Sequence, residues 1–353
     1  IRADIALWPN GSNTFTDYLD SNGSPDSSEP VKIQCKITVE GDSLTADFTG
    51  TDAQVPGAIN CTLSFTASCV ALCVRSVMRE EIPNTAGIFK PLHIIAPPGT
   101  VVNGLMPAAS SMRGVTGFRT TDVVFGALSG LVPDRVMAAG EGGNTLVILG
   151  GHHKDTARRY VYYELLSGTW GARPDRDGND GLCNPANVAS NIPVEEAECD
   201  YPVRIERYGL VRDTGGAGRF RGGMAVERQW RLLEGDSSLL IRSDRRDHLP
   251  YGLGGGKPGS PSINVLHHED DTKEVLPVMV STTMREGETL YHRQAGGGGY
   301  GDPFERDPEV VARDVKDDRV SVEAARKEYR VVLKPETYEV DERETRALRD
   351  ERV

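Results

Sequence analysis

A run of glycines near the carboxyl end is the first feature whose residue types could do chemistry. The segment QAGGGGYGDP at 294–303 contains a literal G-x-G-x-x-G at Gly296, Gly298 and Gly301. In dinucleotide-binding folds this pattern joins a strand directly to a helix whose amino end holds a pyrophosphate. Here a proline follows Asp302 and keeps it out of helical geometry, so the next helix is expected only from Asp307.

We therefore interpret this run as structural. Glycines permit positive-φ turns and allow the backbone to pack close to another chain. The residues to which we assign this structural and subunit-packing role are Gly296, Gly298, Gly299, Gly301 and Asp302.

A second glycine-rich segment, GLGGGKPG at 252–259, comes nearest to a triphosphate-binding loop. Such a loop needs a lysine followed by Ser or Thr at the start of a helix. Lys257 instead precedes Pro258, which has neither a hydroxyl for magnesium nor a backbone N–H. We therefore predict no nucleotide or other cofactor site on this chain.

Histidine and cysteine side chains offer isolated metal ligands without a complete set. Two adjacent histidines beside carboxylates can ligate a divalent metal, and two cysteines four apart on a helix can share one. Solvated histidines on loop ends and small buried thiols explain the same residues without a metal. The residues concerned are His152, His153, His267, His268, Cys69 and Cys73.

The long polar loop at 164–198 is the better candidate for a site. Carboxylate and amide side chains separated by glycines can line a pocket for a small amide or imide, but they can equally satisfy the backbone of the loop itself. We assign Glu164 and Asp177 as candidate catalytic groups. The candidate substrate-binding residues are Arg113, Trp170, Asn184 and Asn187.

The elements that must position these residues are mostly strands. Alternating apolar residues around EGD predict a hairpin at 31–50, and apolar spacings of three and four predict helices at 63–80 and 115–131. Further strands are expected at 88–95, 145–150, 159–166, 203–212, 224–233, 237–243, 263–267 and 275–280. The predicted fold class is α+β, with β-rich mixed sheets, a few flanking helices and a short helical C-terminal region.

Turn composition and capping residues divide the chain into four portions. These are a mixed α/β portion at 1–166 that continues from a missing N-terminal region, a functional polar loop at 167–200, a β-rich portion at 201–303, and a helical segment with a charged tail at 304–353. Asp307 and Ser321 are expected to cap two short helices in the last portion. The charged segment from Pro335 is expected to need a partner subunit to become ordered.

Charge and composition exclude several classes of partner. The chain of 353 residues has a formal net charge of −12 and no basic cluster, which argues against nucleic acid. No apolar run approaches the about 18 residues of a membrane span. The amino end lacks the pattern of a signal peptide, and the six cysteines form no C-x-x-C. We expect a cytoplasmic protein, and a piece of a longer subunit.

Several ordered blocks together resemble the hydantoinase B/oxoprolinase family over nearly the whole chain. The blocks are DFTGTDAQVPGAIN (47–60), IPNTAGIFKPLHIIAPPGTVVN (82–103), YYELLSGTWGARPDRDGNDG (162–181), NIPVEEAE (191–198), LVRDTGGAGRFRGG (210–223) and GGGGYGDPFERDPEVVARDVKDDRVSVEAARKEYRVVL (296–333). Asp318 and Arg330 depart from the pattern, because the family usually has glycine at both positions.

The resemblance implies the C-terminal part of the B subunit of an ATP-dependent cyclic-amide hydrolase, acting on a hydantoin, lactam or 5-oxoproline-like ring. It implies a heterotetramer or larger assembly with an A-type subunit that carries ATP and Mg. It also implies a divalent metal, Zn or Mn, in an N-terminal half that precedes Ile1, so no metal ligand maps onto this chain. A subunit of an ATP-dependent acetone or acetophenone carboxylase and a non-catalytic assembly scaffold remain as alternatives.

Overall fold

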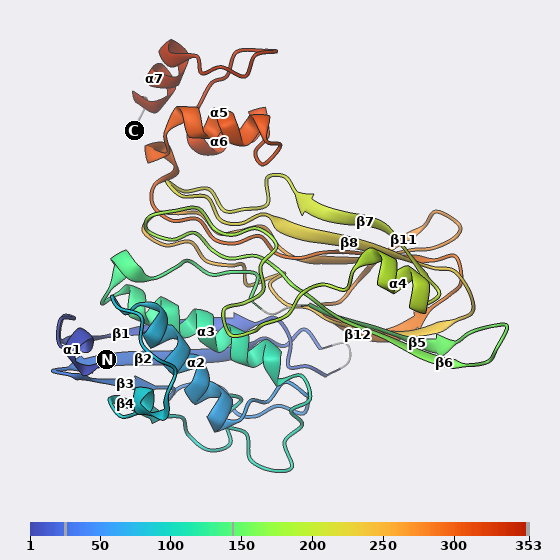
Figure 1. The fold of residues 1–353 in the computed structure, drawn as a ribbon, viewed down its shortest axis with the longest axis horizontal. Helices are drawn as coiled ribbons and strands as arrows, with labels where there is room; N and C mark the ends of the chain where they lie inside the picture. The colour runs from blue at the N-terminus through green and yellow to red at the C-terminus, as the bar shows by residue number, and fades with distance from the viewer. Residues whose placement is uncertain (25–26, 143–144, 351–353) are drawn as a thin grey trace.

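The computed structural model describes residues 1–24, 27–142 and 145–350. Figure 1 shows an N-terminal sheet covered by helices, a pair of stacked sheets beside it, and a group of C-terminal helices at the top. In the described residues, strands β7 to β13 follow one another without a helix and α5 to α7 come together at the end, so the predicted α+β class is confirmed.

The N-terminal layer is a four-stranded sheet in the order β1-β2-β3-β4. Its strands are β1 (Gly11–Leu19), β2 (Val31–Glu40), β3 (Ser43–Asp47) and β4 (Leu92–Ile95). The predicted hairpin at 31–50 is confirmed, since Glu40 pairs with Ser43 across the turn. Three short helices lie along the same part of the chain: α1 (Arg2–Ile5) before β1, η1 (Ala86–Phe89) before β4, and η2 (Pro133–Arg135) after the sheet.

Two longer helices cover this sheet. They are α2 (Leu63–Ser76) and α3 (Arg113–Ser129), and both were expected close to these bounds. The α3 helix packs on β1 and β2, while α2 packs on α3 through an edge-to-face contact between Phe65 and Phe118. Gly117 makes this contact possible, because a Cβ there would lie 2.6 Å from the Phe65 ring.

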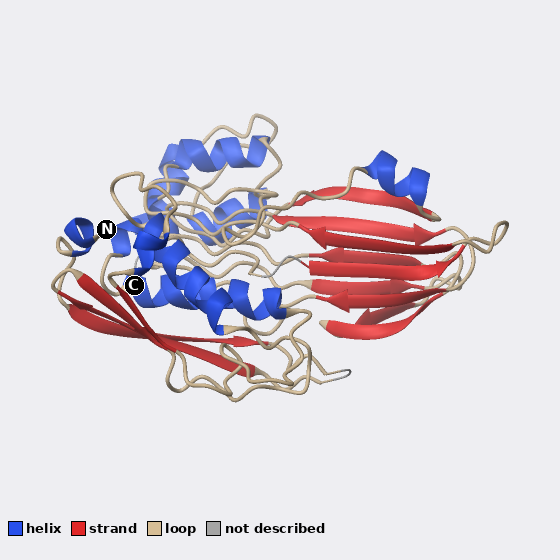
Figure 2. Ribbon diagram, turned by 60° about the horizontal axis from the view of Figure 1, so that its bottom comes forward, coloured by secondary structure: helices blue, strands red, loops and turns tan. Residues whose placement is uncertain are grey.

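The remaining strands form two sheets packed face to face, visible at the right of Figure 2. One has the order β12-β9-β5-β6, with β5 (Thr145–His152), β6 (Arg159–Leu166), β9 (Ser237–Arg242) and β12 (Met279–Met284). The other has the order β11-β10-β13-β8-β7, with β7 (Val203–Val211), β8 (Ala225–Leu232), β10 (Ile263–His267), β11 (Lys273–Leu276) and β13 (Thr289–Arg293). Fully buried Trp230 lies in the core between them.

Two expectations for this region were wrong. The single strand predicted at 275–280 is divided at Pro277, so that β11 belongs to one sheet and β12 to the other. Proline has no N–H for a ladder, which explains the division. The polar loop at 167–200 also contains a short helix, α4 (Val194–Asp200), whose first turn carries Glu195 and Glu196.

The C-terminal segment contains η3 (Pro303–Glu305), α5 (Pro308–Lys316), α6 (Val322–Tyr329) and α7 (Glu342–Asp350). The predicted caps are confirmed, because Asp307 accepts from the Glu309 N–H and Ser321 accepts from the Ala324 N–H. None of the helices within the described ranges is long and apolar enough to cross a membrane.

The charged segment from Pro335 is ordered against its own chain over α7, contrary to the expectation that it needs a partner. Arg349 of this helix donates through Nη2 to the carbonyl oxygens of Arg306 at 2.8 Å and Tyr329 at 3.2 Å. Thr345 on the same helix is buried. Tyr329 is the last residue of α6, where a positive charge is favourable, and this contact ties α7 to the rest of the C-terminal segment.

Candidate functional site

Loops from distant parts of the sequence meet at one end of the stacked sheets. Figure 2 shows them between the strands on the right and the helices on the left. Gly298 donates its N–H to the Ala139 carbonyl at 2.8 Å, and Ala139 donates to the Tyr251 carbonyl at 3.0 Å. Gly223 donates to the Trp170 carbonyl at 3.0 Å. We call this region the loop layer, and it consists of residues 138–142, 167–171, 214–223, 250–260 and 294–301.

The glycine run forms the middle of the loop layer and packs against its own chain. A Cβ on Gly296 would lie 1.8 Å from the Thr214 carbonyl oxygen, and one on Gly298 would lie 2.0 Å from that of Tyr251. Such contacts are shorter than any side chain tolerates, so close backbone approach explains these glycines. Of the assigned glycines, Gly301 alone has a positive φ, of 75°, and the positive-φ explanation was wrong for the others.

The donors of this run are already used. Each N–H group bonds to a backbone carbonyl: Gly296 to Ser260 (3.1 Å), Gly297 to Gly223 (2.9 Å), Gly298 to Ala139 (2.8 Å), Gly299 to Lys257 (2.9 Å) and Gly301 to Leu253 (2.9 Å). A phosphate cradle needs free N–H groups that point at the anion. Asp302 serves the backbone too, because it accepts from the Phe304 N–H at 2.9 Å. The run therefore does not fit a nucleotide.

Asp177 is bound by arginines of two segments. It faces Arg306 through both carboxylate oxygens and accepts from the Arg221 N–H at 2.7 Å. Burial alone would raise the pKa of Asp177, but hydrogen bonds and charge from Arg306 lower it below its ordinary value. This carboxylate therefore holds the polar loop to the C-terminal segment, and its catalytic role stays a prediction.

Glu164 lies elsewhere, in the core between the stacked sheets. Its Oε1 accepts from Arg228 at 2.8 Å and from the Ile192 N–H at 3.1 Å, and its Oε2 accepts from the Tyr162 hydroxyl. Burial raises the pKa of Glu164, against the opposing charge of Arg228. The structure thus gives Glu164 and Asp177 separate sets of partners and does not join them in one pocket.

The four candidate substrate-binding residues are likewise engaged close to their own positions. Trp170 donates through Nε1 to the Cys183 carbonyl at 2.6 Å, Asn184 accepts from the Ala186 N–H at 2.9 Å, and Asn187 accepts from the Val188 N–H at 2.8 Å. These bonds satisfy the loop internally. Arg113 is exposed in the first turn of α3 and donates to the Ser110 carbonyl at 3.3 Å. A role in substrate binding remains a prediction for all four.

The histidine and cysteine candidates form no metal centre in the described ranges. His153 lies 3.0 Å from Glu234, and His268 lies 2.7 Å from Glu288. The thiols of Cys69 and Cys73 are buried and point to the carbonyl oxygens of Gly117 and Thr121. Within those ranges no three His, Cys, Asp or Glu side chains are arranged to hold a metal ion.

A cluster of buried charges that sequence reasoning missed joins the N-terminal layer to the chain after β9. Arg119 of α3 lies 2.5 Å from Asp244 and 3.2 Å from Asp17 of β1. Arg245 lies 2.8 Å from Asp17 and 2.5 Å from Asp122. We call this the charge cluster, and it consists of Asp17, Asp20, Arg119, Asp122, Asp244 and Arg245.

The charge cluster perturbs its own carboxylates. Burial raises the pKa of Asp244 to about 6, although Arg119 opposes the shift, and burial also raises the pKa of Asp122. Arg245 has a φ of 66°, which is strained for a side chain of its size. Perturbed carboxylates and backbone strain in one place are typical of functional sites, so this cluster is a candidate in its own right.

The one signal in the sequence for this cluster was the short run SDRRDH at 243–248, which concentrates charge directly after a strand. The contact between Arg245 and Asp17 joins residues 228 positions apart. Spacing arguments reach only local neighbours, so the cluster could not be assembled from the sequence.

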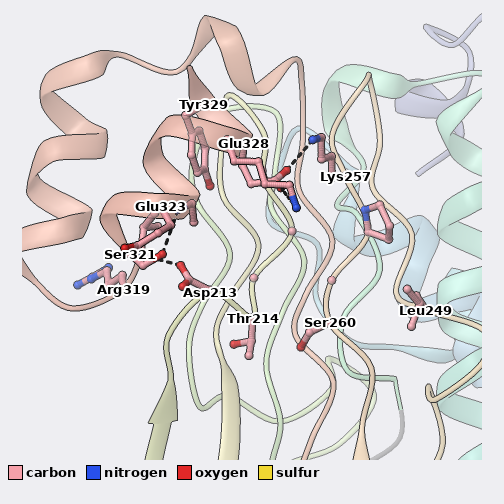
Figure 3. Close-up of a pocket in the computed structure, with 18 residues that line it drawn as sticks. Asp213, Thr214, Leu249, Lys257, Ser260, Arg319, Ser321, Glu323, Glu328 and Tyr329 are labelled. Atoms are coloured by element: carbon pink, nitrogen blue, oxygen red, sulfur yellow. Dashed lines mark hydrogen bonds and ion pairs between the residues drawn. The ribbon is translucent and has the colours of Figure 1, made fainter. Parts of the chain in front are cut away.

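A cleft of about 460 Å³ separates the loop layer from α6 (Figure 3). Lys257 and Glu328 face each other across it, with Nζ 2.6 Å from Oε2. The Ser321 N–H donates to Asp213 at 2.7 Å, so a carboxylate already occupies the amino end of α6. This leaves the cleft with no excess of positive charge for an anionic ligand.

The comparisons with known proteins agree on one family. The family model described as hydantoinase B/oxoprolinase matches residues 1–303. A protein named as the B subunit of a D-/L-hydantoinase, from Pseudomonas sp. (strain NS671), is 32% identical over 99% of this chain and 60% of its own length. The chain thus spans about three fifths of that relative.

Two solved structures resemble the chain over 99% of its length. The crystal structure of an ATP-dependent caprolactamase from Pseudomonas jessenii has a TM-score of 0.84 at 27% identity, with 61% of that chain covered. A nucleotide-free acetone carboxylase has a TM-score of 0.86 at 17% identity, with 54% of that chain covered. At that identity the second likeness shows the fold alone.

Proposed function

This chain belongs to the hydantoinase B/oxoprolinase family, and from that premise we propose that it is part of the B subunit of an ATP-dependent cyclic-amide hydrolase. The likeness to the caprolactamase carries the proposal. It covers 99% of the chain, and therefore includes the loop layer and the charge cluster as well as the sheets. The ring opened would be that of a hydantoin, a lactam or 5-oxoproline.

The proposed division of labour follows from the residues. The N–H groups of the glycine run are bonded within the chain, and Lys257 is paired with Glu328. We therefore propose that ATP and Mg bind an A-type subunit in a heterotetramer or larger assembly. A divalent metal, Zn or Mn, would lie in a portion of the B subunit that this chain does not span.

The chemistry explains why ATP is needed. Resonance stabilises an unstrained amide. The nitrogen is also a poor leaving group, because the amide anion that would depart is strongly basic. Transfer of a phosphoryl group to the amide oxygen gives an electrophilic carbon that water can attack. In this scheme the chain positions the ring at the loop layer, and Asp177 holds the polar loop in place through Arg306.

The test is the reaction of the assembled enzyme. A B subunit containing this chain would be co-expressed with its A-type partner and incubated with hydantoin, caprolactam or 5-oxoproline. Ring-opened product that requires ATP is the expected result. ATP-dependent carboxylation of acetone without ring opening would favour the carboxylase that shares this fold. If a complex whose B subunit lacks residues 1–353 of this chain opens the ring as fast as the intact complex, this chain is only an assembly scaffold.

A further inference from the structure

We propose that His248, held by Asp20, transfers the proton during ring opening, an inference that rests on the proposed function. The His248 Nδ1 lies 2.8 Å from Oδ1 of Asp20, and its side chain is 32% exposed while that of Asp20 is fully buried. The imidazole stacks on Tyr18, with ring centroids 5.0 Å apart. A half-buried histidine with a buried carboxylate partner is the arrangement that general bases use.

Asp20 is fixed by its surroundings. Its carboxylate accepts backbone N–H groups from Arg246 at 2.6 Å, Asp247 at 3.3 Å and His248 at 3.0 Å. Burial alone would raise the pKa of Asp20, but the charge of Arg119 and these hydrogen bonds lower it. The carboxylate is therefore ionised at neutral pH and can only accept.

The ionised carboxylate sets the tautomer of His248. Because Asp20 only accepts, the proton of neutral His248 must be on Nδ1. The lone pair is then on Nε2, on the part of the ring that is not bound to Asp20. When Nε2 accepts a proton, the imidazolium forms beside a carboxylate that stabilises it.

Charges on three segments surround this pair. Those on the chain after β9 are Asp244, Arg245, Arg246 and Asp247, α3 contributes Arg119, and the third segment, after β1, holds Asp20 of the pair itself. The Asp20 N–H donates to Asp244 at 3.0 Å, so the pair is continuous with the charge cluster.

The proposed step balances. Water adds across the C=N bond of the O-phosphorylated ring: its oxygen bonds to carbon, and its proton passes through Nε2 to the ring nitrogen. As the adduct collapses, the hydroxyl proton moves to nitrogen and the C–N bond breaks, which leaves an amine and an acyl phosphate. A second water releases carboxylate and phosphate, and His248 ends neutral.

The experiment compares H248Q with wild type in the assembled enzyme. We expect H248Q to lower kcat for ring opening roughly 10²- to 10⁴-fold with little change in KM. Rapid-quench analysis should still show ADP formed in the first turnover, without ring-opened product. The control is H152Q, because His152 is exposed at the end of β5 that lies away from the loop layer.

A second variant keeps the base and removes its partner. D20N should lower kcat with little change in KM, and D20N/H248Q should be no slower than H248Q, because Asp20 acts through His248. Losses that add in the double variant would show that Asp20 does not position His248 for catalysis. If wild type opens the ring and H248Q does so equally fast, this inference is wrong and the proposed function stands. If wild type shows no ATP-dependent ring opening, both are wrong.

Discussion

Asp177 and Arg306 form a two-point ion pair, with Nη1 2.7 Å from Oδ1 and Nη2 2.8 Å from Oδ2. The same guanidinium donates to Asp314 of α5 at 2.7 Å. Because Asp177 belongs to the polar loop and Arg306 opens the C-terminal segment, this pair couples two regions that are distant in sequence. Planar two-point contacts of this kind give geometric specificity as well as stability.

The first prediction concerns this pair. Asp177→Asn should lower the free energy of unfolding by roughly 1–3 kcal/mol, because it leaves the Arg306 guanidinium short of an anionic partner. Urea unfolding measures the loss. Asp175→Asn is the matched control, since Asp175 pairs with Arg176 on the surface and both side chains are at least 60% exposed. Equal stability of the two variants would contradict a structural role for Asp177.

The second prediction is a pH dependence at Asp244. Its folded pKa of about 6 exceeds the ordinary 3.8, so the folded state binds this proton more tightly than the unfolded state. Ionisation of Asp244 therefore lowers the free energy of unfolding as the pH rises from about 4 to about 6. Above that range the group is ionised in both states, and its contribution no longer changes with pH. When the pH is lowered from 7 to 3, the free energy of unfolding of wild type, measured with urea, should rise by about 3 kcal/mol relative to that of Asp244→Asn. A constant difference between the two proteins would refute this.

The third prediction returns to the glycine run. Gly298→Ala places a Cβ 2.0 Å from the Tyr251 carbonyl oxygen, and backbone atoms cannot move aside as a side chain can. We expect the free energy of unfolding to fall by about 1–3 kcal/mol. This loss of stability should be the primary effect of the substitution, and any loss of activity should follow from it. Gly209→Ala in β7 is the control, because nothing lies within 4 Å of its added Cβ.

Thermal unfolding and size-exclusion chromatography of the isolated chain would compare the stability and the size of Gly298→Ala with those of Gly209→Ala. Normal stability of Gly298→Ala together with selectively weakened ATP binding by the assembled enzyme would mean that the run contacts phosphate after all. Normal stability with weakened assembly would mean that it packs against a partner subunit.

The features that could be predicted from the sequence are those decided by near neighbours. The caps at Asp307 and Ser321 and the hairpin about Glu40 depend on bonds within three residues. The chain passes from one sheet to the other between β11 and β12, and this step depends on how the two sheets pack. The charge cluster depends on contacts between distant residues, such as that of Arg245 with Asp17. The local signs of these features, Pro277 and the charged run at 243–248, do not show which distant residues they meet, and the polar loop was therefore preferred as the candidate site.

Glycine positions show the same limit. The composition of the run 296–299 indicated that side chains are excluded there, and the structure confirms that exclusion. The reason differs from the one expected, because the obstruction comes from carbonyl oxygens of loops far away in the sequence. A local pattern can show that glycine is needed without showing what it meets.

The last prediction concerns Asp318 and Arg330, which stand where the resemblance places glycine. Both have the left-handed backbone that glycine adopts without strain, with φ of 58° and 53°. Asp318→Gly should raise the free energy of unfolding by about 0.5–1 kcal/mol, because its ion pair with Arg212 is exposed and contributes little. Arg330→Gly should gain less or lose stability, since its guanidinium lies 4.4 Å from the centre of the Phe304 ring. Urea unfolding of both variants checks the order, and a larger gain for Arg330→Gly would show that the Phe304 contact does not stabilise the fold.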